Sequence, residues 1–175
     1  ATAPSGGVFR GRLNYSTGQG SLTVRFSNNH NVSHTVQNIG IGDVFVIAGQ
    51  SNAAGYAKNF SQLNQSNPFN VTMYREDDAW AAASDPTDSN DLVGGSSWPY
   101  LGNYVTQNRS VPVSFITTAT GGTSILVWQK GTSEYDKMLQ QVSEATKGTM
   151  RVKSMLFFQG ESDISANIGG NYSFY

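Results

Sequence analysis

Residues 8–42 combine short apolar segments with turn-rich stretches. The segments VFRGRLN, SLTVRF and HTVQNIGI alternate in part between apolar and polar residues, and STGQG and SNNHNVS separate them. A period of two over such short runs predicts β-strands, and the Gly, Asn and Ser clusters between the runs predict turns. We therefore expect residues 1–42 to form a β-rich N-terminal segment, a meander of the kind that ends a β-sandwich.

From residue 43 onward, longer apolar runs alternate with helical segments. VFVIAG at 44–49, VPVSFITTATGG at 111–122 and VKSMLFFQGESD at 152–163 each end in small or polar residues, and VTMYRE at 71–76 is a weaker strand candidate. Continuous apolar runs with β-branched residues are typical of strands that are covered on both faces. We expect these runs to be the strands of one sheet.

A helix is expected after Ser97. Serine is a favourable N-cap residue, and Pro99 falls within the first turn, where its missing N–H costs nothing. The residues expected to form the buried stripe of this helix are Tyr100, Leu101, Tyr104 and Val105.

A second helix is expected in SEYDKMLQQVSEATKG. Ser133 and Asp136 resemble a capping box at its start, and Gly148 is a typical stop signal. The apolar residues at helical spacing are Tyr135, Met138, Leu139 and Val142.

Strands that alternate with helices predict a parallel sheet with helices on both faces, which is an α/β domain over residues 43–175. The carboxyl edge of that sheet would gather Ser51, Gly121, Gly122, Gln159 and Glu161. Open α/β sheets bind their ligands at this edge.

Composition excludes several classes of function. The 175 residues carry a net charge of −1 with only 13% charged residues, so no basic stripe is present for nucleic acid. There is no apolar stretch near 18 residues, and we expect no membrane span. Cysteine is absent, which excludes disulfides, thiolate metal sites and cysteine nucleophiles. His, Asp and Glu do not occur at metal-ligand spacing either, so no metal site is expected.

Asparagine occurs often in Asn-x-Ser/Thr triplets, the acceptor pattern for N-glycans. With 15 Asn and 35 Ser plus Thr, chance predicts about three triplets. Two readings remain open, glycosylation or simply the Asn/Ser/Thr-rich surface of a secreted bacterial protein. Either reading favours a secreted, extracellular or periplasmic setting, and the opening ATAPSGG is what we expect of a processed or shortened chain. The seven triplets begin at Asn14, Asn31, Asn59, Asn64, Asn70, Asn108 and Asn171.

The residues at the sheet edge suit acyl transfer, which needs a nucleophile, a base and donors aimed at the oxyanion. Ser51 lies at a strand-to-helix junction, where its own N–H would be a donor assisted by the helix dipole. A glycine loop at Gly121-Gly122 would allow close approach of the substrate. The side-chain amide of Gln159 ends a neighbouring strand and offers a further donor.

Three sequence blocks resemble those of a known family. GDVFVIAGQSNAAG is similar to the first block of the SGNH hydrolases, and specifically of the carbohydrate O-acetylesterases with Gly-Gln-Ser-Asn, the sialate O-acetylesterase and acetylxylan esterase-like groups. VPVSFITTATGGTSILVW resembles the second block and MLFFQGESD the third. The resemblance covers about residues 42–165 and implies a three-layer α/β/α, flavodoxin-like sheet.

The resemblance also implies roles for individual residues. Ser51 would be the nucleophile. The oxyanion hole would comprise the N–H of Ser51, a backbone N–H at Gly121 or Gly122, and the Gln159 side chain. Of the two glycines we favour Gly122, because it directly precedes the Thr123-Ser124 turn. The implied reaction removes an acetyl group from an acetylated carbohydrate through an acetyl-enzyme, without metal or cofactor.

Further roles are assigned around this centre. Asn52 and Glu161 would orient the loops. Glu161 and Asp163 resemble the carboxylate pair of a glycoside hydrolase, but we expect them to accept hydrogen bonds from loop amides instead. Trp128 follows the glycine loop and is either a residue that stacks on a sugar ring or a partly buried aromatic.

One family feature is missing. The family's base is a histidine in an Asp-x-x-His block, which this sequence lacks; its two histidines, His30 and His34, lie in a polar turn. Either the chain lacks a C-terminal part, which could act as a separate partner chain, or it is a pseudo-enzyme. We favour the first, since the predicted sheet also lacks a last strand and helix. The alternative class is a non-catalytic carbohydrate-binding or adhesion module.

Overall fold

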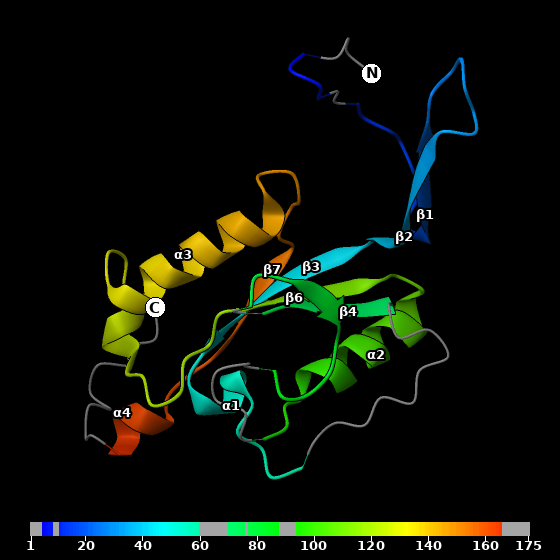
Figure 1. Ribbon diagram of the computed structural model, residues 1–175. Coiled ribbons are helices and arrows are strands. Elements are labelled where there is room, and N and C mark those ends of the chain that lie inside the picture. Colours follow the sequence, from blue (N-terminus) through cyan, green and yellow to red (C-terminus); the bar gives the residue numbers. More distant parts are fainter. Residues whose placement is uncertain (1–4, 9–10, 60–69, 76, 88–93, 166–175) are drawn as a thin grey trace.

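The described residues of the computed structural model form two separate β-sheets. A two-stranded antiparallel ribbon, β1 (Gly18–Arg25) and β2 (Ser33–Ile41), projects from one end of the body (Figure 1). The body holds a five-stranded sheet with the order β5-β4-β6-β3-β7. The structure describes residues 5–8, 11–59, 70–75, 77–87 and 94–165.

The five-stranded sheet is mostly parallel. β3 runs parallel to both β6 and β7, β4 runs parallel to β6, and only β5 is antiparallel to its neighbour β4. The predicted parallel sheet is therefore confirmed. Because β6 lies between β3 and β4, the strand order differs in detail from a flavodoxin sheet, whose first strand lies between its second and third. The strand bounds are β3 (Asp43–Gly49), β4 (Val71–Tyr74), β5 (Trp80–Ala82), β6 (Val113–Thr117) and β7 (Ser154–Phe158).

Helices cover both faces of this sheet, as predicted. Figure 1 shows α3 on one face and α1 with α2 on the other. None of the helices in the described part of the chain is long and apolar enough to cross a membrane. The helix bounds are α1 (Ser51–Ala54), α2 (Trp98–Arg109), α3 (Ser133–Thr146) and α4 (Glu161–Ser165), with a 3₁₀ helix at Ile125–Trp128.

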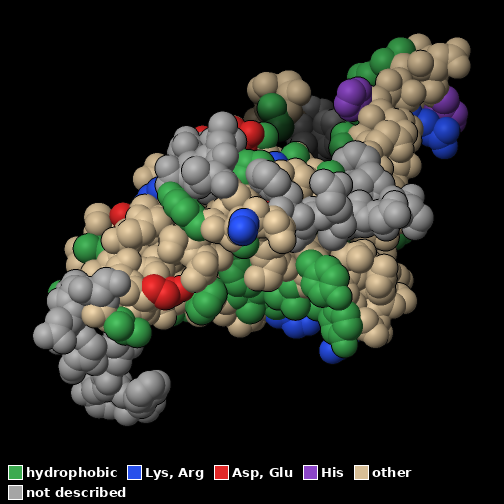
Figure 2. Space-filling view, turned by 90° about the horizontal axis from the view of Figure 1, so that it is seen from below, with side chains coloured by type: hydrophobic (Ala, Val, Ile, Leu, Met, Phe, Trp, Pro, Cys, Tyr) green, Lys and Arg blue, Asp and Glu red, His purple; other side chains and the backbone are tan. Residues whose placement is uncertain are grey.

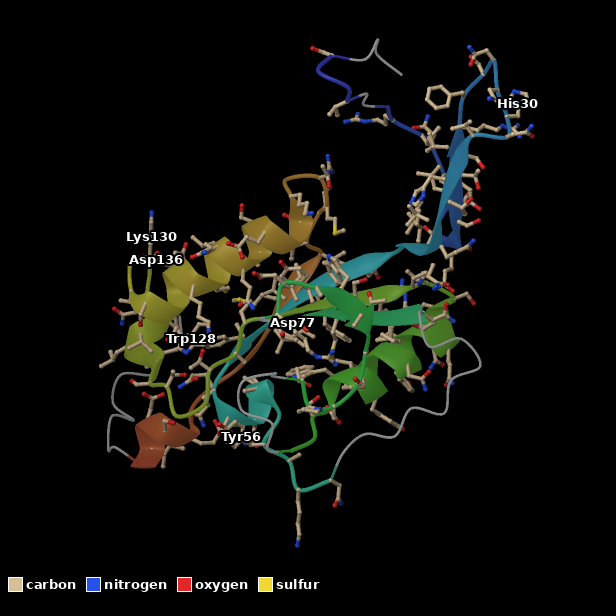
Figure 3. The ribbon with its side chains drawn as sticks, in the orientation of Figure 1. His30, Tyr56, Asp77, Trp128, Lys130 and Asp136 are labelled. Atoms are coloured by element: carbon tan, nitrogen blue, oxygen red, sulfur yellow. The ribbon has the colours of Figure 1, made fainter. Side chains whose placement is uncertain are left out.

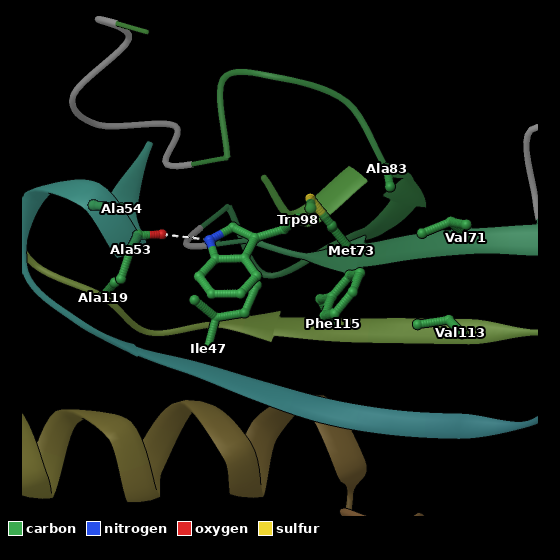
Figure 4. Packing of buried hydrophobic residues seen from close by; sticks show 10 residues of the cluster. All are labelled: Ile47, Ala53, Ala54, Val71, Met73, Ala83, Trp98, Val113, Phe115 and Ala119. Atoms are coloured by element: carbon green, nitrogen blue, oxygen red, sulfur yellow. Dashed lines mark hydrogen bonds between the residues drawn. The ribbon is translucent and has the colours of Figure 1, made fainter. Parts of the chain in front are cut away.

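The main core lies between the sheet and the α1–α2 face. Trp98 is at its centre, where its indole N–H donates to the Ala53 carbonyl at 2.7 Å and its ring packs near Phe115 (Figure 4). This bond fixes α1 against α2. A smaller cluster of Val46, Tyr74, Ile116 and Ala145 lies on the α3 face.

The predicted stripe of α2 is wrong at two positions. Tyr100 and Tyr104 are 67% and 58% exposed, whereas Trp98 and Gly102 are buried. A Cβ at Gly102 would lie 2.4 Å from a Val71 methyl, so the helix axis comes unusually close to the sheet. Leu101 and Val105 of the predicted stripe do pack against the core, so apolar periodicity found part of the contacting face and missed Trp98 and Gly102.

The ends of α3 also differ from the prediction. Its N-cap is Thr132, so the capping box expected at Ser133 is wrong. The helix ends one residue before Lys147, which takes the left-handed conformation at φ 46° ahead of Gly148. Leu139 of the predicted stripe is 49% exposed.

The N-terminal segment forms two of its three expected strands. Residues 11–14, part of the first expected strand, are not in a strand. In the ribbon, Leu22 pairs with Val36 on one face, and the hydroxyls of Thr23 and Thr35 are 2.8 Å apart on the other. The apolar face is largely open, with Val36 49% exposed.

Candidate active site

Ser51 is the first residue of α1, directly beyond the carboxyl end of β3, and is half-buried. The turn before it depends on Gly49, whose φ is +125°. A Cβ at this position would lie 1.9 Å from the Phe158 carbonyl oxygen. Only glycine therefore lets β3 leave the sheet while it stays paired with β7.

The chain leaves the neighbouring strands β3 and β6 toward opposite faces of the sheet. β3 is followed by α1 on one face, and β6 is followed by α3 on the other. Connections that diverge in this way open a crevice at the carboxyl ends of the strands. Ser51 lies at this point.

Glu161 of α4 joins the first block to the third. Its carboxylate accepts hydrogen bonds from Gln50 Nε2 at 2.5 Å and from the Asn52 side-chain amide. Gln50, only 1% exposed, in turn accepts from the Ser162 N–H at 2.9 Å. These contacts are of the kind that the predicted orienting roles of Asn52 and Glu161 require.

Asp163 of α4 joins the second block to the third. It is fully buried, and its carboxylate accepts from Ser124 Oγ at 2.5 Å and from the Ile125 N–H at 3.0 and 3.1 Å. Gln159 Nε2 donates to it at 3.0 Å. The expectation that this carboxylate binds a loop amide is confirmed.

The two glycines of the second block differ in their surroundings. A Cβ at Gly121 would lie 2.9 Å from the Tyr56 hydroxyl, so the tyrosine covers this residue. Gly122, at φ +73°, has nothing within 4 Å of the corresponding position. The free space beside the loop is therefore at Gly122.

Several donors at this edge have no partner among the residues that the structure describes. In the part of the chain that the structure describes, no hydrogen bond engages the backbone N–H of Ser51, Gly121 or Gly122, or the Ser51 hydroxyl. Backbone N–H groups that lack a protein partner are available to solvent or to a ligand. Backbone N–H groups of this kind are what the predicted oxyanion hole would require.

The side chain of Gln159 is held inside the protein. Its Nε2 donates to the Thr123 carbonyl at 2.7 Å as well as to Asp163, while its Oε1 is buried and unpaired among the described residues. Its predicted role as an oxyanion donor stays a prediction, and it requires the release of one of these two bonds.

Trp128 is buried rather than presented to solvent. It is 8% exposed, its indole N–H donates to Thr123 Oγ1 at 3.0 Å, and its ring meets Phe157 edge-on at 5.7 Å. This leaves little surface for a sugar ring, so substrate binding by Trp128 stays a prediction. Tyr56, at 41% exposed and beside Gly121, is a more accessible aromatic.

Both histidines belong to the ribbon. His30 lies in its connecting loop and His34 is the second residue of β2. Figure 2 shows histidine atoms on the projecting ribbon, and Figure 3 places His30 at its tip, at the opposite end of the molecule from Tyr56 and α1. Neither residue is placed to act as a base for Ser51.

Other features lie away from this edge. Within the described ranges no group of three or more His, Asp or Glu is arranged to hold a metal ion. A hollow of about 710 Å³ lies at the amino ends of the strands, beside Val44, Trp80 and Pro112, and none of the predicted site residues lines it.

The predicted glycan acceptors are mostly at the surface. Asn14, Asn31, Asn59 and Asn108 are exposed, and Asn70 is half-buried. Glycosylation of these residues stays a prediction. Two further acceptors, at positions 64 and 171, lie outside the described residues.

The parallel sheet, the helices on its two faces and the three sequence blocks linked through α4 define an SGNH-like carbohydrate esterase fold. Residues 41–173 match the family model described as carbohydrate esterase, sialic acid-specific acetylesterase. The chain belongs to this family.

Known proteins support the fold. The chain is 26% identical over 142 residues to a probable carbohydrate esterase of Arabidopsis thaliana, covering 69% of this chain and 54% of that protein. The crystal structure of an Arabidopsis thaliana protein matches with a TM-score of 0.59 and 24% identity, over 70% of this chain and 59% of that one. NanS matches with a TM-score of 0.54 and 11% identity, over 70% and 54%. The chain thus spans a little over half the length of these relatives.

Proposed function

We propose that the protein is a serine esterase that removes O-acetyl groups from carbohydrate. The observation that carries the proposal is the pair of carboxylates on α4. Glu161 binds the turn that holds Ser51, and Asp163 binds the glycine loop. Residues from three distant blocks are thereby linked at one edge of the sheet, and membership of a carbohydrate esterase family supports the chemistry.

In the proposed reaction, Ser51 Oγ attacks the acetyl carbonyl carbon and its proton passes to a base. The N–H groups of Ser51 and Gly122 stabilise the oxyanion, with Gly121 as the alternative glycine and Gln159 as the third donor. The C–O bond to the sugar then breaks, and the sugar oxygen takes up the proton. Water hydrolyses the acetyl-enzyme by the same steps and releases acetate.

The base must come from outside the residues that surround Ser51 in this structure. Both histidines of the chain lie on the ribbon. We propose that a histidine is supplied by another part of the same protein or by a separate chain that contains this part. The proposed substrates are acetylated sialic acid or xylan-type glycans, and the proposed location is extracellular or periplasmic.

The test is Ser51→Ala in the protein that carries the histidine. Acetate release from an acetylated sugar and from p-nitrophenyl acetate should fall on the order of 10³-fold or more, because the nucleophile is lost. A fluorophosphonate should label the wild type at Ser51 and leave Ser51→Ala unlabelled. Ser133→Ala, at an exposed serine of α3, is the matched control and should keep full activity. Full activity in Ser51→Ala would contradict the proposal, and sugar binding without labelling of the wild type would indicate a binding module.

A further inference from the structure

The short helix α4 holds two loops through carboxylates that point in different directions. Residues two apart in an α-helix are rotated by about 200°, so they lie on opposite sides of it. Glu161 accordingly contacts Gln50 and Asn52, while Asp163 contacts Ser124 and Ile125. One helical turn thus sets the distance between the Ser51 turn and the glycine loop.

The Asp163 carboxylate is completely buried, which is unusual for a charged group. A carboxylate removed from water is costly unless donors replace its hydration. Asp163 is 0% exposed, and its donors come from the 3₁₀ helix start at Ser124 and Ile125 and from the end of β7 at Gln159. All three belong to segments that border the candidate site.

The glycine loop is held at both ends. At its start, Thr120 Oγ1 donates to Glu134 of α3 at 2.6 Å, and the Thr120 N–H donates to the Gly49 carbonyl at 2.9 Å. At its end, Ser124 and Ile125 bind Asp163. Only the glycines between these anchors lack hydrogen bonds within the described residues, so the anchors determine where their N–H groups lie.

We propose that Asp163 is a positioning residue of the esterase site. It fixes the Gly122 N–H and the Gln159 carboxamide relative to Ser51, and it governs kcat rather than substrate affinity. This proposal rests on the proposed esterase function. The oxyanion develops only as the carbonyl is attacked, so a displaced donor weakens transition-state binding and leaves ground-state binding of the sugar nearly unchanged.

Asp163→Asn tests the proposal. The substitution keeps the size of the side chain but replaces one acceptor oxygen with a donor, so the site loses an acceptor for the groups that bind Asp163. In the active protein, kcat for p-nitrophenyl acetate and for an acetylated sugar should fall about 100-fold, as for the loss of one oxyanion donor, while KM stays within about threefold. Asp136→Asn makes the same change at an exposed aspartate of α3 and should leave both constants unchanged (Figure 3). A kcat within about threefold of wild type in a folded Asp163→Asn protein would overturn the proposal.

A structural readout separates this proposal from the esterase proposal. In ¹H–¹⁵N spectra, Asp163→Asn should shift the Gly122 amide and the Gln159 side-chain amide, and Asp136→Asn should shift neither. Unmoved Gly122 and Gln159 signals would refute positioning even in an active esterase. Full activity of Ser51→Ala would instead refute the esterase chemistry, whatever Asp163 does.

A milder variant decides the matter if Asp163→Asn does not fold. Ser124→Ala removes one donor to Asp163 and leaves the buried charge with its other partners. We expect kcat to fall about tenfold with KM unchanged. An unchanged kcat in Ser124→Ala would then overturn the proposal.

Discussion

Strands β6 and β7 flank β3 on its two sides and differ sharply in burial. Both have five residues, run parallel to β3 and are largely apolar, VSFIT in one and SMLFF in the other. In β6 every residue except Ser114 is buried, whereas in β7 Met155, Phe157 and Phe158 are 42–49% exposed. β6 has β4 beside it and helices on both faces, while β7 has β3 as its single strand neighbour in the described part of the chain.

The difference shows that an apolar sequence alone does not determine how deeply a strand is buried. The strands and helices packed against it do. Strands covered on both faces are expected to be continuous apolar runs. That reading is right for β6 and for most of β3, and wrong for β7 in this structure. Equivalent substitutions on the two sides of β3 should therefore have unequal effects.

The largest difference is expected between two phenylalanines. Phe115→Ala in β6 removes a ring that is 1% exposed and should lower the free energy of unfolding by about 3–5 kcal/mol, because it leaves a cavity. Phe157→Ala in β7 starts from a ring that is 42% exposed and should cost about 1 kcal/mol. Urea denaturation of both variants measures the two values. Equal losses would mean that β7 is as well covered as β6.

The next effect concerns the junction between β3 and β7. Gly49→Ala places a methyl group against the Phe158 carbonyl and forces a side chain into φ +125°. The backbone conformation alone should cost about 1–3 kcal/mol, and the displaced turn should also lower esterase activity. Gly131→Ala, at φ +84° with open space around it, is the control for conformational strain without a clash. Equal melting temperatures in the two variants would show that the close approach to β7 is unimportant.

A smaller effect is expected at Tyr74 of β4, and it should show how far water is excluded from this side of the sheet. Burial raises the pKa of the Tyr74 hydroxyl above 10.0, and its hydrogen bond to Asp78 at 3.1 Å raises it further. A raised folded-state pKa gives stability that is complete below pH 10 and is lost as the pH rises through the folded value. Tyr74→Phe should cost about 1 kcal/mol at pH 8 and progressively less above pH 10. A difference that stays constant over this range, in denaturation at several pH values, would contradict the assignment.

The smallest change in stability is expected in β7, the more exposed of the two strands beside β3. Met155 is 48% exposed in β7, which is an edge strand within the described part of the chain, and edge strands favour association between chains. Met155→Lys should change the free energy of unfolding by less than about 0.5 kcal/mol and should reduce self-association. Light scattering against concentration measures the latter. Unchanged association would show that the β7 edge is not the surface through which chains meet.

Much of the fold could be predicted because its strands and helices have strong local signals. The parallel sheet, the helices on both faces and the position of Ser51 after a buried strand followed from apolar runs and their polar ends. In α2, Leu101 and Val105 were predicted correctly, but the close packing at Gly102 could not be predicted because a glycine leaves no apolar signal. The two strands of the ribbon were predicted, whereas residues 11–14 of the first expected strand are not in a strand.

The candidate site was predicted in outline and not in its contacts. The order of the blocks indicated that Ser51 and Gln159 lie at one edge of the sheet. The hydrogen bond from Gln50 to Glu161, and the two bonds that Gln159 Nε2 donates, depend on side-chain directions that could not be predicted from the sequence. Tyr56 was missed because a lone tyrosine after a glycine carries no pattern. Asp163 was predicted to accept hydrogen bonds from loop amides, but its complete burial and its bond to Gln159 carry no signal in the sequence.

The joining of Gln50 to Glu161 has a consequence for the order of folding. These partners are 111 residues apart, and the contact of Ser162 with Gln50 spans 112. Contacts between such distant residues form slowly, because the chain between them must first be brought together. During synthesis the serine turn precedes Glu161 by 111 residues, so its clamp is made only after residues 161 and 162 have left the ribosome. The turn is therefore fixed only after all the strands of the five-stranded sheet have been made.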